Sequence, residues 1–76
     1  MINNNTYNDI LSAAMESLSV KYSELREHSA EFANGIYTVE MATDFQRHQC
    51  MIDADSMEVL GLMSEPAVFS YPYSME

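Results

Sequence analysis

Two side chains that could perform chemistry, His48 and Cys50, stand two positions apart. On a strand both would point to one face, so they could share a metal ion or form a nucleophile–base pair. A zinc site needs two further ligands, and the chain offers only His28 and scattered carboxylates. A cysteine nucleophile also needs an anion-binding feature, and no glycine-rich or helix-start segment accompanies Cys50. We therefore expect no metal site here, and interpret the pair as a packed cysteine and a partly exposed histidine.

The spacing of Asp53 and Asp55 is that of the start of a calcium-binding loop. The next ligand position holds Met57 instead of an acid or amide, and the position that needs glycine holds Glu58. This segment is therefore interpreted as a charged turn. The chain has only 2 glycines, so a glycine-rich loop that cradles phosphate cannot be built either. The sequence predicts a protein that is not an enzyme and that uses no cofactor.

Carboxylates form the most informative pattern in the sequence. If residues 6–33 are one helix with a step of about 100° per residue, five carboxylates fall within a sector of about 80° opposite the apolar stripe. No Lys or Arg lies in this sector, which would extend about 33 Å along the helix. The pattern is either an ordinary solvated face or a surface that competes for a basic groove. The residues concerned are Asp9, Glu16, Glu24, Glu27 and Glu31.

The overall charge limits the classes of partner. The chain has 12 acidic residues against 3 basic ones, Lys21, Arg26 and Arg47, and a formal net charge of −9. Such a balance opposes direct binding to nucleic acid or to an anionic membrane, because both are negatively charged. It favours a protein partner with a basic surface.

Length and cysteine content set the size and the compartment. A chain of 76 residues is expected to form one domain, residues 1–76, with a thin core, and association into a homodimer would bury more surface. Its single cysteine cannot form an intrachain disulfide, which favours a reducing compartment. Neither a secretory signal nor an apolar run of about 18 residues is present. We therefore expect a cytoplasmic protein.

The elements follow from two different periodicities. Apolar residues between positions 6 and 33 recur at helical spacing, and Asn34-Gly35 is a good helix stop. After Gly35 the residues alternate, which predicts strands over 36–41 and 47–54. Residues 55–63 could form a short helix or a third strand, and we favour the strand. The prediction is an α+β fold, α-β-β-β: a long N-terminal helix packed on a small antiparallel sheet, the meander covering about 36–63 and a tail covering 64–76.

This layout resembles that of PepSY-type modules, in which a long helix precedes an antiparallel meander. The segments that carry the resemblance are Tyr37-Thr38-Val39-Glu40 and the run from Ile52 to Leu60. The family usually has glycine where Met57 stands and in the hairpin near Asp44, and it is usually exported. The resemblance implies an accessory module that binds a protein or peptide through its sheet and its C-terminal tail. The tail residues that could dock are Phe69, Tyr71 and Tyr73.

Two functions are carried forward. The first is a non-enzymatic inhibitor or adaptor whose acidic helix face binds a basic, nucleic-acid-binding surface of a partner protein. Small phage-encoded inhibitors of CRISPR or restriction systems, which act in the host cytoplasm, are similar in style. The alternative is the PepSY-like accessory module, in which the acidic face only provides solubility.

Overall fold

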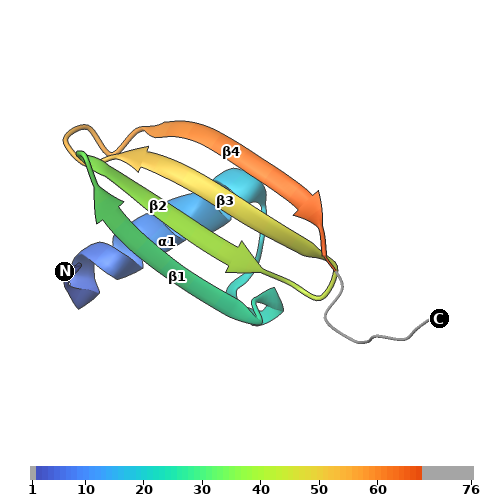
Figure 1. Ribbon diagram of the computed structural model, residues 1–76. Coiled ribbons are helices and arrows are strands. Elements are labelled where there is room, and N and C mark those ends of the chain that lie inside the picture. Colours follow the sequence, from blue (N-terminus) through green and yellow to red (C-terminus); the bar gives the residue numbers. More distant parts are fainter. Residues whose placement is uncertain (1, 68–76) are drawn as a thin grey trace.

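The first element is a helix whose two ends are both fixed by local hydrogen bonds. In this computed structural model, which describes residues 2–67, α1 spans Asn4–Leu18 (Figure 1). At its start, Asn3 Oδ1 accepts a hydrogen bond from the Thr6 N–H at 2.8 Å. At its end, Ser19 adopts a left-handed conformation (φ 57°) and the Val20 N–H donates to the Met15 oxygen at 2.9 Å. The left-handed Ser19 and the hydrogen bond from Val20 end the helix in a Schellman-type cap.

The prediction of one helix over residues 6–33 is therefore wrong in its second half. After the 3₁₀ turn η1 (Tyr22–Glu24), residues Glu27–Ala33 form strand β1. Asn34 and Gly35 both have positive φ, 54° and 76°, which is the signature of a two-residue type I′ hairpin turn. The dipeptide interpreted as a helix stop is thus the turn of a β-hairpin, and the hairpin pairs residues 27–33 with the next strand.

The remaining strands form the expected meander. β2 spans Ile36–Ala42, β3 spans Gln46–Asp53 and β4 spans Val59–Pro66. The sheet has the order β1-β2-β3-β4 and every neighbouring pair is antiparallel. The α+β class and the helix packed on an antiparallel sheet are confirmed, but the sheet has four strands instead of the predicted three, because residues 27–33 form β1 and do not continue the helix.

The segment that the sequence left open between helix and strand is a turn followed by a strand. β4 begins at Val59, as favoured, and extends to Pro66, so the expected tail of residues 64–76 begins inside it. Between β3 and β4, the Asp53 carboxylate accepts the Asp55 N–H at 2.8 Å, and Met57 closes the turn with a φ of 62°. These hydrogen bonds stabilise the segment as a turn, so it does not form a helix.

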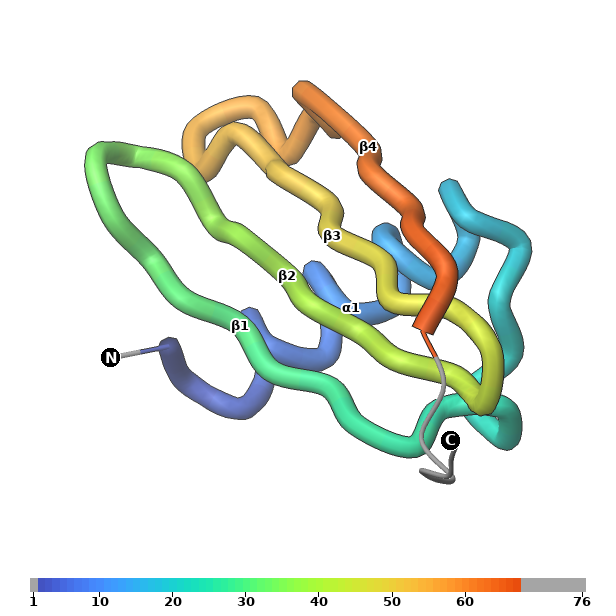
Figure 2. Tube along the Cα trace, turned by 45° about the vertical axis from the view of Figure 1, so that its right-hand side comes forward, coloured from blue at the N-terminus to red at the C-terminus, as the bar shows by residue number. Residues whose placement is uncertain are grey.

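The core lies on one side of the sheet. α1 covers that side, and Figures 1 and 2 show it crossing behind the strands. The apolar positions of the sequence predict a core of Leu11, Ala14, Leu18, Tyr22, Leu25, Tyr37, Val39, Ile52, Val59 and Leu62. Of these, Leu11, Ala14, Val39 and Ile52 are buried, and Leu18, Leu25 and Tyr37 are half-buried. Tyr22, Val59 and Leu62 are exposed. The main cluster of buried residues consists of Ile10, Leu11, Ala14, Val39, Met41, Cys50 and Ile52.

The opposite side of the sheet carries no element of the described chain, and we call it the open face. It consists of the side chains that alternate with those of the core. No helix within residues 2–67 has both the length and the apolar character needed to cross a membrane.

Candidate interaction surface

The five carboxylates expected on one helix face are divided between two sides of the molecule. Asp9 and Glu16 lie exposed on α1, and Glu24 lies in η1. Glu27 and Glu31 lie exposed on β1. The single row expected from helical spacing does not form, because the helix ends at Leu18 and the chain then changes to a period of two.

Strand pairing brings two other carboxylates to the side that Glu27 and Glu31 occupy. One row of directly paired residues across the four strands consists of Glu27, Ala42, Arg47 and Glu65. In another row Glu40 lies opposite Gln49. All of these side chains alternate with core residues such as Val39 and Cys50, so they project from the open face. We name the acidic patch as the four exposed residues Glu27, Glu31, Glu40 and Glu65.

The dimensions of the acidic patch follow from sheet geometry. At a strand spacing of ~4.8 Å, β1 and β4 are about 14 Å apart, and Glu27 and Glu31 are about 13 Å apart along β1. Glu40 and Glu65 were missed by sequence reasoning because they are distant in the chain. The signal that could have found Glu40 was the Asn34-Gly35 hairpin turn, since it fixes the register of β1 against β2.

The negative charge of the acidic patch is only partly neutralised by neighbouring side chains. Arg47 is the only Lys or Arg in the four described strands, and its Nη2 lies 3.8 Å from Glu27 Oε1. Gln49 Nε2 donates to Glu40 Oε2 at 3.4 Å. Both contacts are exposed, and exposed ion pairs stabilise by only about 0–1 kcal/mol. The open face therefore keeps a net negative charge that a cationic group can approach.

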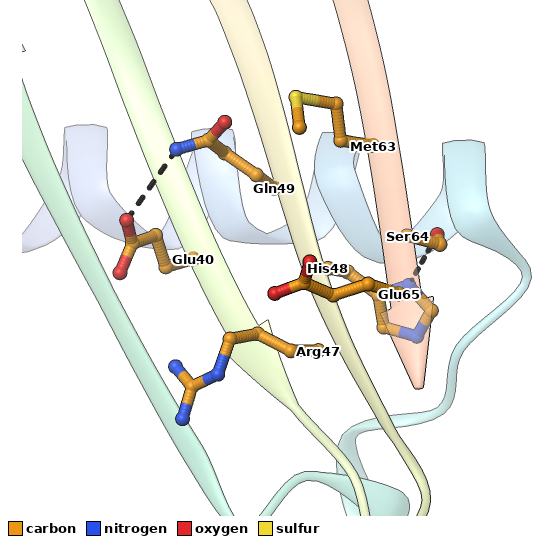
Figure 3. Close-up of a pocket in the computed structure, with 7 residues that line it drawn as sticks. All are labelled: Glu40, Arg47, His48, Gln49, Met63, Ser64 and Glu65. Atoms are coloured by element: carbon orange, nitrogen blue, oxygen red, sulfur yellow. Dashed lines mark hydrogen bonds between the residues drawn. The ribbon is translucent and has the colours of Figure 1, made fainter. Parts of the chain in front are cut away.

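Two shallow depressions lie on the open face. One, of about 210 Å³, lies over β3 and β4 and is lined by Glu40, Arg47, Gln49, Met63 and Glu65 together with His48 and Ser64 (Figure 3). A second, of about 290 Å³, lies over β1 and β2 and shares Glu40 and Arg47 with the first. The two shared side chains stand between the depressions. A basic side chain entering either depression would therefore meet the Glu40 carboxylate, with the Arg47 guanidinium beside it.

The side chains of His48 and Cys50 lie on the core side of β3. His48 is 4% exposed, its Nδ1 lies 2.7 Å from Ser64 Oγ, and its Nε2 has no hydrogen-bond partner. His48 is thus more buried than expected. Burial also raises the pKa of the Cys50 thiol, which keeps the sulfur neutral and a poor nucleophile.

Other candidate groups have local structural roles. Asp53 and Asp55 shape the turn before β4, since the carboxylate of Asp53 caps backbone N–H groups. No cluster of three or more potential metal ligands occurs among residues 2–67. The predicted docking residues Phe69, Tyr71 and Tyr73 lie outside the described residues.

Comparison with known proteins returned no match to a family model, to a curated protein or to a solved structure.

Proposed function

We propose that this protein is a non-enzymatic binding protein, an inhibitor or adaptor, whose open face engages a basic surface of a partner protein. The observation that carries the proposal is the acidic patch, in which three strands, β1, β2 and β4, present Glu27, Glu31, Glu40 and Glu65 to solvent on one side of the sheet. The proposed binding surface lies on the sheet, whereas the sequence predicted it on the helix. It retains Glu27 and Glu31 from the five carboxylates singled out in the sequence.

Charge and rigidity support this proposal. A four-stranded sheet holds the carboxylates at fixed separations, so binding a partner would not require the backbone to be ordered first. With a net charge of −9, the protein would approach a basic groove rapidly and would be repelled by nucleic acid itself. Carboxylates spaced on a rigid face could compete there with phosphates, in the manner of phage inhibitors of CRISPR or restriction systems.

The proposed compartment is the cytoplasm, which would be the host cytoplasm for a phage-encoded protein. Cys50 supports it, because this thiol is free and buried. An unpaired cysteine is typical of proteins in a reducing compartment.

The test is a pull-down from a native host lysate with two matched variants. The first replaces the four residues of the acidic patch: Glu27→Gln, Glu31→Gln, Glu40→Gln and Glu65→Gln. The second removes the same charge elsewhere, on α1, in η1 and in the turn before β4: Asp9→Asn, Glu16→Gln, Glu24→Gln and Asp55→Asn. Bound proteins are washed with salt rising from about 0.1 to 0.5 M. Over this range the Debye length, the distance at which charges are screened, shortens from about 10 Å to a few Å.

We expect the acidic-patch variant to lose a basic partner at least tenfold while the matched control retains it. Equal loss in both variants would mean that only net charge matters, and equal retention would mean that the patch is not the site. Either result contradicts the proposal. A partner that stays bound at high salt would favour the PepSY-like alternative, in which the sheet and residues 64–76 bind.

A further inference from the structure

His48 is the one polar residue that is buried within residues 2–67. Its Nδ1 lies 2.7 Å from Ser64 Oγ, and its Nε2 is enclosed without a hydrogen-bond partner (Figure 3). A neutral imidazole has one N–H and one lone pair, so the Ser64 hydroxyl can satisfy Nδ1 in either tautomer. An imidazolium has two N–H groups. The one at Nε2 would then be a buried donor without an acceptor, on a ring that carries a buried positive charge.

The strands around His48 present no compensating negative charge to it. Met41 of β2 and Ser64 of β4 lie directly opposite His48 in the two ladders. Cys50 shares the core side of β3, and burial raises the pKa of its thiol, so it is neutral as well. The charged side chains of the four described strands alternate with core residues and project from the open face: Glu27, Glu31, Glu40, Arg47, Asp53 and Glu65.

The helix that covers the core side is apolar where it faces the sheet. Its buried residues are Ile10, Leu11 and Ala14. The other histidine on this side, His28 of β1, is exposed and bonds through Nδ1 to the Tyr7 hydroxyl. The charged residues of α1 and of the segment up to the end of η1 are all exposed: Asp9, Glu16, Lys21 and Glu24. No carboxylate of α1 or η1 is therefore buried beside the His48 ring.

We infer that His48 is a pH-sensitive switch between β3 and β4. The neutral ring stabilises β4 on the sheet through Ser64, and protonation of the ring opens that strand. β4 is the element most easily released, because it pairs only with β3 among the described strands and all of its residues except Gly61 are exposed.

The direction of the pH effect follows from proton binding. A solvated histidine gains a proton at about pH 6.5, whereas the closed sheet disfavours a proton on His48. The open or unfolded state therefore binds more protons, so the stability of the closed state is full above this pH and falls as the pH decreases. For one histidine, the equilibrium constant for opening should rise about tenfold between pH values of about 7.5 and 5.5. Carboxylates stay ionised over this range, since they ordinarily titrate at about pH 4.

Opening of β4 would also alter the acidic patch. Glu65 follows Ser64 in β4, and the same strand contributes Met63 to the depression in Figure 3. Release of the strand would remove both side chains from the open face, so a basic partner would be bound less tightly in acid. This effect on binding depends on the proposed function, whereas the acid sensitivity of β4 does not and is measured without a partner.

The first experiment follows the two histidine rings of the full chain by NMR during a pH titration. His28 is the internal control: it is exposed, and the Tyr7 oxygen can accept a hydrogen bond from its imidazolium. Its ring signals should shift as the pH falls through about 6.5. The ring signals of His48 in the closed state should keep their neutral position. A His48 ring that titrates together with His28 while β4 stays closed would overturn the inference.

Amide hydrogen exchange on the same samples, corrected for the intrinsic rate at each pH, locates the opening. The amides that bond from β4 to β3 should lose protection about tenfold between pH values of about 7.5 and 5.5. The amides of β1, the other edge strand, should keep theirs. Equal loss in β1 and β4 would overturn the assignment of the switch to β4.

The second experiment compares denaturant unfolding at the same two pH values in matched variants. His48→Met removes the titrating ring and keeps an apolar side chain in the core, so its unfolding constant should change less than about twofold. His28→Gln removes the exposed ring and should retain the tenfold change of the unmodified chain. Each variant is compared with itself, so a less stable variant still gives a result. A tenfold change that persists in His48→Met, or that disappears in His28→Gln, would overturn the inference.

Discussion

At the scale of single residues, the turn between β3 and β4 holds one strained position. Met57 has a φ of 62°, although side chains other than glycine disfavour this left-handed region. The surrounding hydrogen bonds hold it there: the Met57 N–H donates to the Asp53 oxygen at 2.8 Å, and Asp53 Oδ1 accepts the Asp55 N–H at 2.8 Å. The position therefore favours glycine on backbone grounds alone.

We predict that Met57→Gly raises the free energy of unfolding by about 0.5–1 kcal/mol, because glycine removes the left-handed penalty of ~1–2 kcal/mol and loses part of that gain in chain entropy. The measurement is denaturant unfolding. Ser56→Gly is the control: Ser56 has an ordinary φ and its hydroxyl accepts the Glu58 N–H at 3.3 Å, so this change should destabilise. A loss of stability in Met57→Gly as large as in the control would contradict the assignment of strain.

At the scale of elements, β1 is where local sequence and structure diverge. Residues 27–33 contain no β-branched residue, and Leu25 and Phe32 continue the helical spacing of the preceding segment. The same stretch also alternates, since His28, Ala30 and Phe32 lie on the helix side of the sheet, opposite Met41, Val39 and Tyr37. Local pattern alone supports both structures, and pairing with β2 decides between them.

We predict that Glu31→Thr stabilises the protein by about 0.5 kcal/mol, because a β-branched residue opposite Thr38 suits an antiparallel pair. In a helix the same change would destabilise. Glu16→Thr removes the same charge from α1 and should lower stability by a similar amount. Unfolding should be measured at low protein concentration. The β1 assignment would be contradicted if both variants lost stability.

At the scale of the whole molecule, charge acts on stability as well as on partner choice. Arg26 and Arg47 are engaged in exposed ion pairs, with Asp44 at 2.7 Å and Glu27 at 3.8 Å. Such pairs contribute about 0–1 kcal/mol each, and they leave most of the net charge of −9 uncompensated. Self-repulsion among the carboxylates therefore destabilises the folded state.

We predict that raising NaCl from about 0.02 to 0.3 M stabilises the dilute protein by about 1 kcal/mol, a Tm increase of ~4–8 °C. Screening weakens the repulsion more than it weakens the two ion pairs. The acidic-patch variant, with a net charge of −9 + 4 = −5, should show a smaller increase. Thermal unfolding at several salt concentrations measures both, and a Tm that falls with salt would show that the ion pairs dominate.

The sequence by itself determined the α+β class, the presence of an N-terminal helix, the strands β2 and β3 and the beginning of β4, because hydrophobic period and turn residues are local properties. It also determined the excess of carboxylates. Tertiary structure decided the identity of β1, and with it the side of the molecule on which Glu27 and Glu31 lie. It also gathered Glu40 and Glu65 beside them, because a strand register joins residues that no local pattern connects.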